Sequence, residues 1–256
     1  MRAPRPDENG WRASPAGRAV LDALLAVVLA PICATCDVLL ERPTRGPVCE
    51  DCWDAIRTYT PPRCERCGAP LPSWRTRELH ATCEALPPGV VRAAALGEYD
   101  GTLRAIVHAL KYGRRRSLAP RLGTLMRLGA AWVLDGADAA VPVPLHRGRR
   151  RRRGFNQAAD LARALGLPVV QALRRARPTL TQTDLPAHRR RANVRGAFDL
   201  ARPAVIGAIR DRTLVLVDDV WTTGATLEAC AAVLAAAGAA EVRAITTARA
   251  TRRPPR

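Results

Sequence analysis

Two adjacent carboxylates, Asp218 and Asp219, stand between an apolar run and a short stretch of small, hydroxyl-bearing residues. The run at residues 214–217 is apolar and rich in β-branched side chains, which is typical of a strand buried on both faces of a parallel sheet. We expect this strand to end at the acidic pair. Residues 222–226 form the hydroxyl-bearing stretch, and an alanine-rich helical pattern begins at about Leu227.

This order of strand, acidic pair, turn and helix suits a sugar phosphate. The N–H groups of the turn and the positive end of the helix dipole can hold a phosphate, and Gly224 would let the backbone approach that anion closely. The carboxylates can accept hydrogen bonds from the two hydroxyls of a ribose. In the alternative interpretation the aspartates only end a strand, and Thr223 or Thr226 caps the helix. Two ionised carboxylates beside so apolar a strand are costly, however, unless something uses them.

Seven of the eight cysteines fall between positions 33 and 83, and most are spaced in pairs. Two residues separate the members of each pair, so one tight turn can present two ligands to a metal ion. A histidine takes the place of an eighth cysteine in the last pair. Four pairs are enough for two tetrahedral zinc sites, so we expect two structural zinc ions. The expected ligands are Cys33, Cys36, Cys49, Cys52, Cys64, Cys67, His80 and Cys83.

The spacing leaves two ways of joining the pairs. In the sequential arrangement of zinc ribbons, the first two pairs hold one ion and the last two hold the other. An interleaved arrangement fits the spacing nearly as well. Little hydrophobic sequence lies between the pairs, and a module this small usually needs a metal to fold. Cys230 lies in a helical pattern, and we expect it in the core.

The chain has 256 residues and a formal net charge of +18. So basic a balance favours a polyanionic partner, either nucleic acid or phosphorylated ligands, although an arginine-rich composition with a solvated surface would give the same charge. No stretch approaches the ~20 apolar residues that span a bilayer. The apolar run at residues 19–30 is interrupted by Asp22 and lacks a convincing cleavage site, so it does not indicate a signal peptide. Thiolate metal ligands favour a reducing compartment, and we expect the protein in the cytoplasm.

Strands alternate with helices over most of the chain. A helix is predicted at residues 18–30. After the cysteine pairs, strands are predicted at 93–98, 138–144 and 241–248, with an edge strand at 168–170 and helices at 101–111 and 118–132. A further helix ends near residue 165. The alternation implies an α/β fold, an open and mostly parallel sheet with helices on both faces, whose ligand lies outside the carboxyl ends of the strands.

These patterns divide the chain into four parts. Residues 1–17 are predicted to be disordered, and residues 18–88 to hold a helix and a small double zinc-binding module. A Pro-Pro-Gly sequence at 87–89 marks the boundary. Residues 89–248 form the α/β domain, and residues 249–256 a basic tail.

Five successive arginines, 149–153, follow the strand predicted at 138–144. We expect them to lie in a loop, where guanidinium groups suit a doubly charged diphosphate. For the middle arginines a solvated basic loop is the alternative. This segment resembles the signature V-P-V-P-L-H-x-x-R-x-x-x-R-G-F-N-Q-A of the ComF family of phosphoribosyltransferase-like proteins. The acidic segment V-L-V-D-D-V-W-T-T-G-A-T resembles the phosphoribosyl-pyrophosphate (PRPP) motif of type I phosphoribosyltransferases, and T-Q-x-x-L, R-x-x-N and G-A-F segments near residues 181–198 are similar to ComF as well.

The resemblance covers about residues 31–248 and departs from the family mainly at His80, where cysteine is usual. It implies a type I phosphoribosyltransferase-like fold, a PRPP-type ligand with Mg²⁺ and, for some members, a role in DNA uptake during competence. The residues that it assigns to PRPP binding are Asp218, Asp219, Thr222, Thr223, Gly224, Ala225, Thr226, Arg153 and Gly154. The polar, basic composition of the segment that holds Gln182, Arg190 and Asn193 suggests a mobile lid over the phosphates. Catalytic roles are assigned to Asp218, Asp219, Arg153 and Lys111.

Two functional hypotheses follow. In the first, the protein is a magnesium-dependent transferase that moves the phosphoribosyl group of PRPP to a nitrogen acceptor. In the second, the site senses PRPP or a nucleotide end while the protein handles single-stranded DNA with the competence machinery. Aromatic residues make up only 4% of the chain, which weakens the case for sequence-specific binding to bases.

Overall fold

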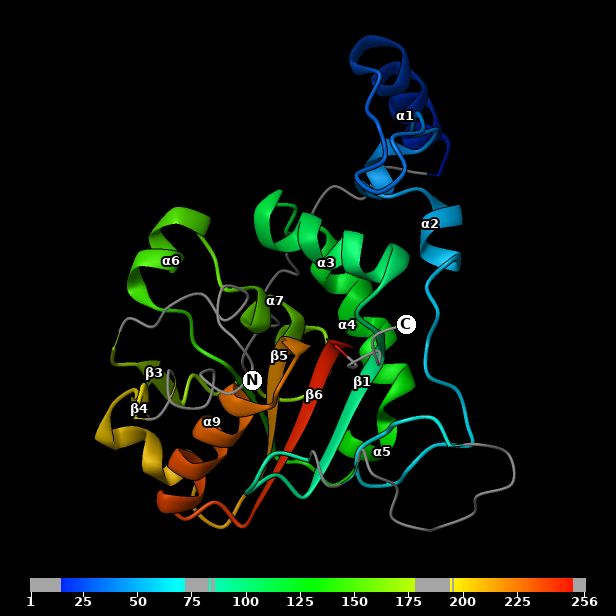
Figure 1. Cartoon of the computed structure of the whole chain (residues 1–256). Coiled ribbons are helices and arrows are strands. Elements are labelled where there is room, and N and C mark those ends of the chain that lie inside the picture. Colours follow the sequence, from blue (N-terminus) through cyan, green and yellow to red (C-terminus); the bar gives the residue numbers. More distant parts are fainter. Residues whose placement is uncertain (1–14, 72–82, 84–85, 178–193, 195, 251–256) are drawn as a thin grey trace, which may run out of the picture. The chain divides into compact units, whose positions relative to one another are not determined.

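The computed structural model describes residues 15–71, 83, 86–177, 194 and 196–250 (Figure 1). The chain separates into two compact units, Met1–Asp54 and Ala55–Arg256. The first unit contains α1 (Pro15–Leu29), η1 (Pro43–Arg45) and α2 (Glu50–Asp54). The backbone N–H of Thr44 donates to Oδ1 of Asp22 at 2.8 Å, which ties η1 to α1. The helix predicted at residues 18–30 is thus confirmed as α1. Most of the predicted disordered N-terminus lies outside the described residues.

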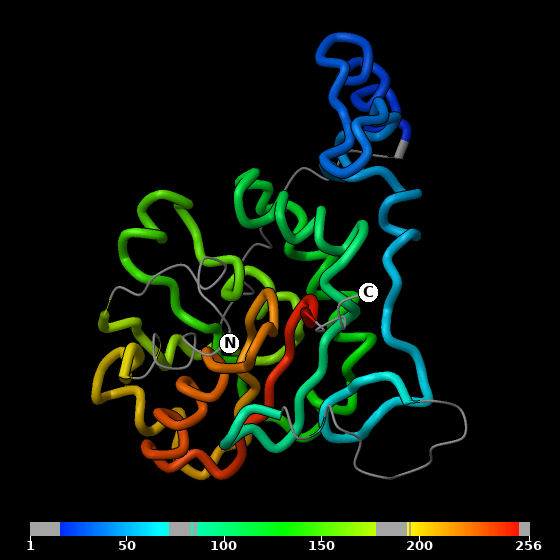
Figure 2. The backbone as a smooth tube through the Cα atoms, viewed as in Figure 1, coloured from blue at the N-terminus to red at the C-terminus, as the bar shows by residue number. Residues whose placement is uncertain are grey.

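The second unit is built on a parallel sheet with the strand order β1-β6-β5-β2. Figure 2 shows β6 running between β1 and β5 after the chain has passed through α9. Val169 forms a parallel bridge with Ala140, so the predicted edge strand is present as a single bridge beside β2. The strands are β1 (Arg92–Glu98), β2 (Ala139–Pro142), β5 (Thr213–Trp221) and β6 (Glu241–Arg249).

Different helices cover the two faces of this sheet. Leu214 and Leu216 of β5 share a core cluster with Leu227, Cys230 and Leu234 of α9, which places Cys230 in the core as expected. Alternate residues of the strands point to the opposite face, where α3, α4 and α7 pack (Figure 1). The α/β fold with helices on both faces is therefore confirmed. These helices are α3 (Gly101–Tyr112), α4 (Leu118–Gly129), α5 (Ala131–Leu134), α7 (Gln157–Arg163) and α9 (Ala225–Ala236). The helix predicted at 118–132 is thus divided into α4 and α5.

The strand β5 does not end at the acidic pair. It keeps pairing with β6 as far as Trp221, which lies opposite Arg249. Its other neighbour, β2, ends at Pro142, opposite Val217. The predicted strand end at residue 217 is therefore wrong, because one neighbour continues where the other stops. Asp218 and Asp219 lie on the part of β5 that projects past β2.

The arginine run is a helix and not the predicted loop. It forms α6 (Arg147–Arg153), whose first turn is capped by His146, since Nδ1 of His146 accepts from the N–H of Gly148 at 3.2 Å. Gly154 ends the helix with a φ of +81°. Arginine is a good helix former, and a glycine with positive φ is a common helix end, so local sequence preferences account for the helix.

A small antiparallel sheet joins the α9 side of the unit. It consists of β3 (Leu173–Arg175) and β4 (Phe198–Leu200), and the 3₁₀ helix η3 (Pro203–Ala208) follows it. Leu173 and Phe198 belong to the same core cluster as Leu227 of α9. Among the helices that the structure describes, none has the length and hydropathy that a membrane span requires.

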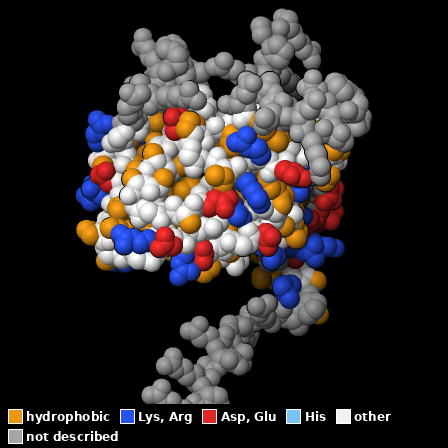
Figure 3. Space-filling view, turned by 90° about the horizontal axis from the view of Figure 1, so that it is seen from below, with side chains coloured by type: hydrophobic (Ala, Val, Ile, Leu, Met, Phe, Trp, Pro, Cys, Tyr) orange, Lys and Arg blue, Asp and Glu red, His pale blue; other side chains and the backbone are white. Residues whose placement is uncertain are grey.

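The surface charge of the described residues is mixed at the end where the strands begin. Figure 3, which views the molecule from below Figure 1, shows Lys and Arg side chains interspersed there with Asp and Glu. Interspersed opposite charges partly cancel the long-range field. Concentrated positive charge is instead found at the carboxyl ends of the strands, around the cavity described next.

Candidate functional site

A cavity of about 450 Å³ lies at the carboxyl ends of β2 and β5. Asp218 and Asp219 lie in its wall, together with Thr222 and Thr226 from the turn that follows β5. The basic residues of the wall are Lys111, Arg114, Arg149, Arg152, Arg153 and Arg175. Basic side chains outnumber the two carboxylates, so the cavity suits a ligand with several negative charges.

Asp219 is buried and held by two side chains. Nζ of Lys111, at the end of α3, lies 2.8 Å from Oδ1 of Asp219. Nε2 of Gln157, at the start of α7, donates to Oδ2 of Asp219 at 2.6 Å. Burial acts to lower the pKa of Lys111, but attraction to Asp219 outweighs it, and the pKa is raised. Lys111 is therefore a stable cation paired inside the cavity wall.

Asp218 has a different environment. It is half-buried, and its Oδ1 accepts the backbone N–H of Asp219 at 2.8 Å. Burial and the neighbouring charge of Asp219 raise the pKa of Asp218 to about 7. A carboxyl group with a raised pKa in a cavity is a recognised mark of a functional site.

The arginines of α6 divide between two faces of the helix. Arg149, Arg152 and Arg153 line the cavity, at the i, i+3 and i+4 spacing of one helical face. The guanidinium of Arg153 lies 5.0 Å from the ring centre of Tyr112. A nitrogen of the Arg114 guanidinium donates to the carbonyl oxygen of Arg152 at 2.6 Å, which links the end of α6 to the turn after α3.

The opposite face of α6 carries Arg147, Arg150 and Arg151, all of them exposed. These residues repeat the same helical spacing on the outer side. One face of α6 therefore lines the cavity, where a diphosphate could bind, and the other face is exposed to solvent, as in the alternative interpretation.

The turn after β5 leads directly into the N-terminus of α9. Gly224 has a φ of +79°, and a Cβ there would lie 2.7 Å from Cγ of Pro87, so a side chain would be both strained and obstructed. The N–H of Ala225 lies 3.5 Å from Oγ1 of Thr223, across the start of α9. Of the predicted phosphate residues, Thr222 and Thr226 line the cavity within the described part of the chain, while Gly224 shapes the backbone between them.

Two predicted site features, Gly154 and the lid, are not found in the described cavity wall. Gly154 ends α6 and is not part of the described cavity wall. The predicted lid residues Gln182, Arg190 and Asn193 lie outside the described residues. Farther along the chain, Phe198 begins β4.

Several residues of the cavity wall are not among those predicted for the site from the sequence. Gln157 stands three residues after Gly154 in the ComF-like motif, and Tyr112 directly follows Lys111, so the sequence carries a signal for both. Arg175 had none, because β3 brings it to the cavity through pairing with β4. Its guanidinium lies 5.1 Å from the ring centre of Phe198, and burial together with Arg149 lowers its pKa.

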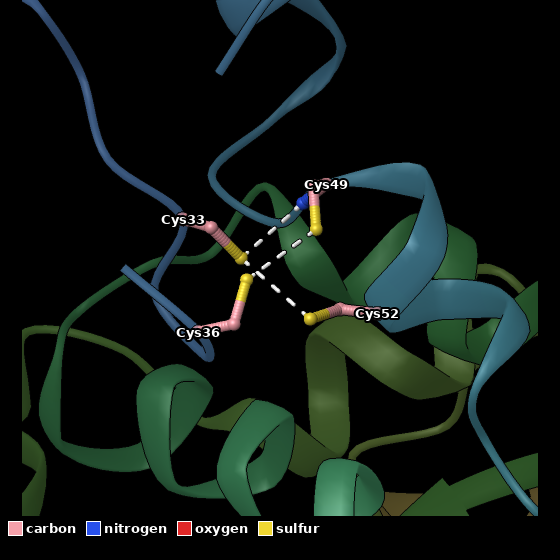
Figure 4. A group of neighbouring side chains, drawn as sticks. All are labelled: Cys33, Cys36, Cys49 and Cys52. Atoms are coloured by element: carbon pink, nitrogen blue, oxygen red, sulfur yellow. Dashed lines mark hydrogen bonds between the residues drawn. The ribbon is translucent and has the colours of Figure 1, made fainter. Parts of the chain in front are cut away.

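The first cysteine cluster, in the first unit, brings Cys33, Cys36, Cys49 and Cys52 together (Figure 4). The Sγ–Sγ distances are 3.9 Å between Cys33 and Cys52 and 3.7 Å between Cys36 and Cys49. Four sulfur atoms ~2.3 Å from a zinc ion would be about 3.8 Å apart, so the cluster fits tetrahedral zinc. Although burial opposes ionisation, backbone N–H groups, first that of Cys49, lower the pKa of Cys33 to about 6, which favours the thiolate form that binds metal.

The second cluster, in the second unit, contains Cys64, Cys67 and Cys83. The Sγ atom of Cys83 lies 3.0 Å from that of Cys64 and 3.7 Å from that of Cys67. Within the described residues the cysteines thus group sequentially, as in zinc ribbons, and not in the interleaved arrangement. His80, the predicted fourth ligand of this cluster, lies outside the described residues, so its ligation stays a prediction.

Comparisons with known proteins agree with both parts of the chain. A family model described as a double zinc ribbon domain matches residues 24–86, and one described as a phosphoribosyl transferase domain matches residues 151–256. Together with the two thiol clusters, the zinc ribbon match supports structural zinc.

Relatives match most of the chain. DNA utilization protein YhgH of Escherichia coli (strain K12) is 34% identical over 206 residues, which cover 77% of this chain and 87% of the relative. YhgH of Salmonella typhi is 34% identical over 222 residues, covering 83% of this chain and 94% of the relative. Competence protein F of Haemophilus influenzae is 30% identical over 209 residues, covering 78% of this chain and 89% of the relative. A solved structure of an allosteric regulatory enzyme of purine biosynthesis is 24% identical with a TM-score of 0.34, and the match covers 50% of this chain and 25% of that chain.

Proposed function

Because the chain belongs to the ComF family of phosphoribosyltransferase-like proteins, we propose that its α/β unit binds PRPP with Mg²⁺ and transfers the phosphoribosyl group to a nitrogen acceptor. One observation carries the proposal: a single cavity combines a half-buried carboxylate, a turn at a helix N-terminus and a row of arginines. PRPP has the matching parts, since it carries ribose hydroxyls, a 5′-phosphate and a diphosphate.

The three parts of the cavity divide the ligand between them. Thr222 and Thr226, with the N-terminus of α9, would hold the 5′-phosphate. Asp218 would accept hydrogen bonds from the ribose hydroxyls. The cavity-facing arginines of α6 would hold the diphosphate, for which their planar guanidinium groups are suited.

In the proposed transfer, the bond between ribose C1 and the diphosphate oxygen breaks, and its electron pair leaves with pyrophosphate. The lone pair of the acceptor nitrogen forms the new bond to C1, and the acceptor loses a proton if it carries one. Negative charge therefore grows on the leaving group in the transition state. Arg149, Arg152 and Arg153 are positioned to stabilise that charge, which is the interaction that lowers a barrier most directly.

The residues of the cavity also fit Mg²⁺. This ion usually keeps several waters and is held by one or two carboxylates together with substrate phosphates. Asp219 is already engaged by Lys111 and Gln157, so Asp218 is the carboxylate that would help to hold Mg²⁺ together with the phosphates of the ligand. When bound, Mg²⁺ would neutralise part of the ligand's charge.

Zinc has a structural part in this proposal. We infer two ions, one in each cysteine cluster, with His80 as the fourth ligand of the second. The proposed module boundaries are residues 18–88 for the zinc-binding part and 89–248 for the transferase-like part. Because thiolate ligands persist in a reducing compartment, the proposed location is the cytoplasm.

A titration of PRPP and Mg²⁺ by calorimetry tests the proposal. Wild type should bind, and Asp218→Asn should weaken binding by roughly tenfold or more, since a hydrogen bond to a charged group contributes about 1.5–3 kcal/mol. Asp211→Asn is the matched control, because Asp211 is exposed and its φ of +57° suits asparagine. Release of pyrophosphate in the presence of a panel of nitrogen bases then tests transfer. Binding without release for any acceptor would leave a PRPP-binding protein that is not a transferase.

One observation favours a second function, the handling of single-stranded DNA. The outer face of α6 presents Arg147, Arg150 and Arg151, which the cavity does not use, and two groups of relatives are named for DNA utilization and competence. Exposed arginines in a row can contact successive phosphates of a strand. Changing these three residues to glutamine should weaken binding of a single-stranded oligonucleotide and leave PRPP affinity within about twofold. An oligonucleotide affinity that does not change would remove α6 from this second function.

A further inference from the structure

The two neighbouring aspartates lie on opposite faces of the sheet. Successive residues of a strand point to opposite faces, and Leu214 and Leu216 of β5 point to the α9 face. The same alternation sends Asp218 to the α9 face and Asp219 to the face covered by α3 and α7. The partners agree with this assignment, because Lys111 ends α3 and Gln157 begins α7.

Both oxygens of Asp219 are already engaged. Oδ1 pairs with Lys111 at 2.8 Å and Oδ2 accepts from Gln157 at 2.6 Å, while Asp219 is only 5% exposed. The amide of Gln157 must turn its NH₂ group toward Asp219, since an ionised carboxylate only accepts hydrogen bonds. Its Oε1 is then buried without a hydrogen-bond partner within the described part of the chain. An unsatisfied buried acceptor is costly, so the fold gives up stability to keep this contact.

Asp218 is the less buried of the two and accepts one backbone N–H, from Asp219. A carboxylate has room for about four hydrogen bonds, so Asp218 keeps acceptor positions for a ligand. A pair of free carboxylates would repel a ligand with several negative charges. The Lys111 ammonium cancels one of the two charges, and the cavity then shows a single carboxylate among its arginines.

We propose that the acidic pair is divided in function, with Asp219 a positioning residue that Lys111 and Gln157 hold in place and Asp218 the one carboxylate that contacts the ribose of the ligand. This inference rests on the proposed function, since it names the roles of residues in the same site. It differs from the expectation that both aspartates hold the ribose. Lys111 acts through Asp219 and has no direct part in bond breaking.

The test adds a second substitution to Lys111→Met and measures PRPP–Mg²⁺ binding by calorimetry. Lys111→Met strands the charge of Asp219 beside an anionic ligand, so affinity should fall roughly tenfold or more. Adding Asp219→Asn removes the stranded charge and should recover most of that loss. Adding Asp218→Asn instead, as the matched control, should weaken binding further. If Asp219→Asn also weakens binding further in the Lys111→Met background, Asp219 contacts the ligand and the proposal is overturned.

Urea denaturation of the same variants gives an independent readout. Lys111→Met should lower the unfolding midpoint, and Asp219→Asn in that background should raise it again. A protein that does not fold with Lys111→Met alone but folds when Asp219→Asn is added would also support the proposal. If neither folds, Gln157→Met decides, because it leaves no charge unpaired: weaker PRPP binding supports the proposal, and unchanged affinity overturns it. No binding of PRPP by wild type would overturn the proposed function and the role of Asp218, whereas a midpoint that Asp219→Asn fails to raise would overturn the anchoring of Asp219.

Discussion

The raised pKa of Asp218 predicts how PRPP binding depends on pH. Burial and the charge of Asp219 bring this pKa from its ordinary 3.8 to about 7, so the carboxyl group of the empty site is about half protonated at pH 7. The proposed ligand needs the ionised form, because the ribose hydroxyls would donate hydrogen bonds to it and Mg²⁺ would be attracted by its charge. Binding must therefore release the proton, and affinity should rise with pH up to about pH 8.

The magnitude follows from the protonated fraction. With a pKa of about 7, about nine tenths of Asp218 is protonated at pH 6 and about one tenth at pH 8, so the affinity for PRPP should fall about tenfold between pH 8 and pH 6. Calorimetry in buffers with different ionisation enthalpies measures the proton release directly. We expect about 0.9 proton per ligand at pH 6 and about 0.1 at pH 8, after subtraction of the ligand's own phosphate ionisation.

The control is Asp218→Asn, in which the remaining pH dependence should be that of the ligand alone. An affinity that changes equally with pH in wild type and in this variant would refute the reasoning. It would mean that the group which titrates is elsewhere, or that the bound site keeps Asp218 neutral. A proton release that increases between pH 6 and pH 8 would also refute the reasoning, because the release is expected to decrease over this range.

The same raised pKa predicts that Asp218→Asn stabilises the empty protein. The gain should be full above about pH 7, decline as the pH falls and vanish below about pH 3, where the aspartate is neutral in both the folded and the unfolded chain; urea denaturation at several pH values will measure it. Removal of zinc by a chelator should lower the melting temperature of the α/β unit as well as unfold the first unit, because Cys67 and Cys83 lie in the α/β core; calorimetric melts with and without chelator decide this. If the outer face of α6 binds single-stranded DNA, replacing its three arginines by glutamine should reduce the slope of log affinity against log salt by about 2, at ~0.7 for each phosphate that the variant no longer neutralises. An unchanged slope in an oligonucleotide titration would locate the DNA-binding surface elsewhere.

Local patterns in the sequence were enough for the elements that carry the site. The apolar run before Asp218 predicted a buried parallel strand, and the helical spacing of Leu103, Ile106 and Leu110 predicted α3. Each of these signals lies in one short segment, and burial on one or both faces leaves a direct trace in it. The pairs of cysteines likewise predicted the metal clusters, because the two members of a pair lie within one short segment.

The end of β5 could not be predicted in this way. It depends on two neighbours, one of which continues to Arg249 while the other stops at Pro142. The separation of Asp218 from Asp219 depends on the same strand geometry. Had the strand ended at residue 217, both carboxylates would be free to turn toward one ligand.

Arg175 could not be predicted for a further reason. The strand β3 has three residues, and its position depends on pairing with β4, more than twenty residues away along the chain. The prediction of a loop for the arginine run was wrong for a different reason, since local sequence preferences favoured a helix. The chemistry of the run suggested a loop, whereas the helix preference of arginine and the flanking cap residues His146 and Gly154 made a helix.

The second cysteine cluster has a consequence for dividing this protein into parts. Cys67, Ala69 and Cys83 share a hydrophobic core with Leu214 and Leu216 of the central sheet, although in the sequence they belong to the zinc ribbon region. A shortened chain that begins at residue 55 keeps the second cysteine cluster. One that begins at residue 89 loses Cys67, Ala69 and Cys83 from its hydrophobic core. The double ribbon is therefore one unit of sequence but two units of folding. An exchange of N-terminal segments between relatives should succeed when the junction lies near residue 54 and yield insoluble protein when it lies near residue 88.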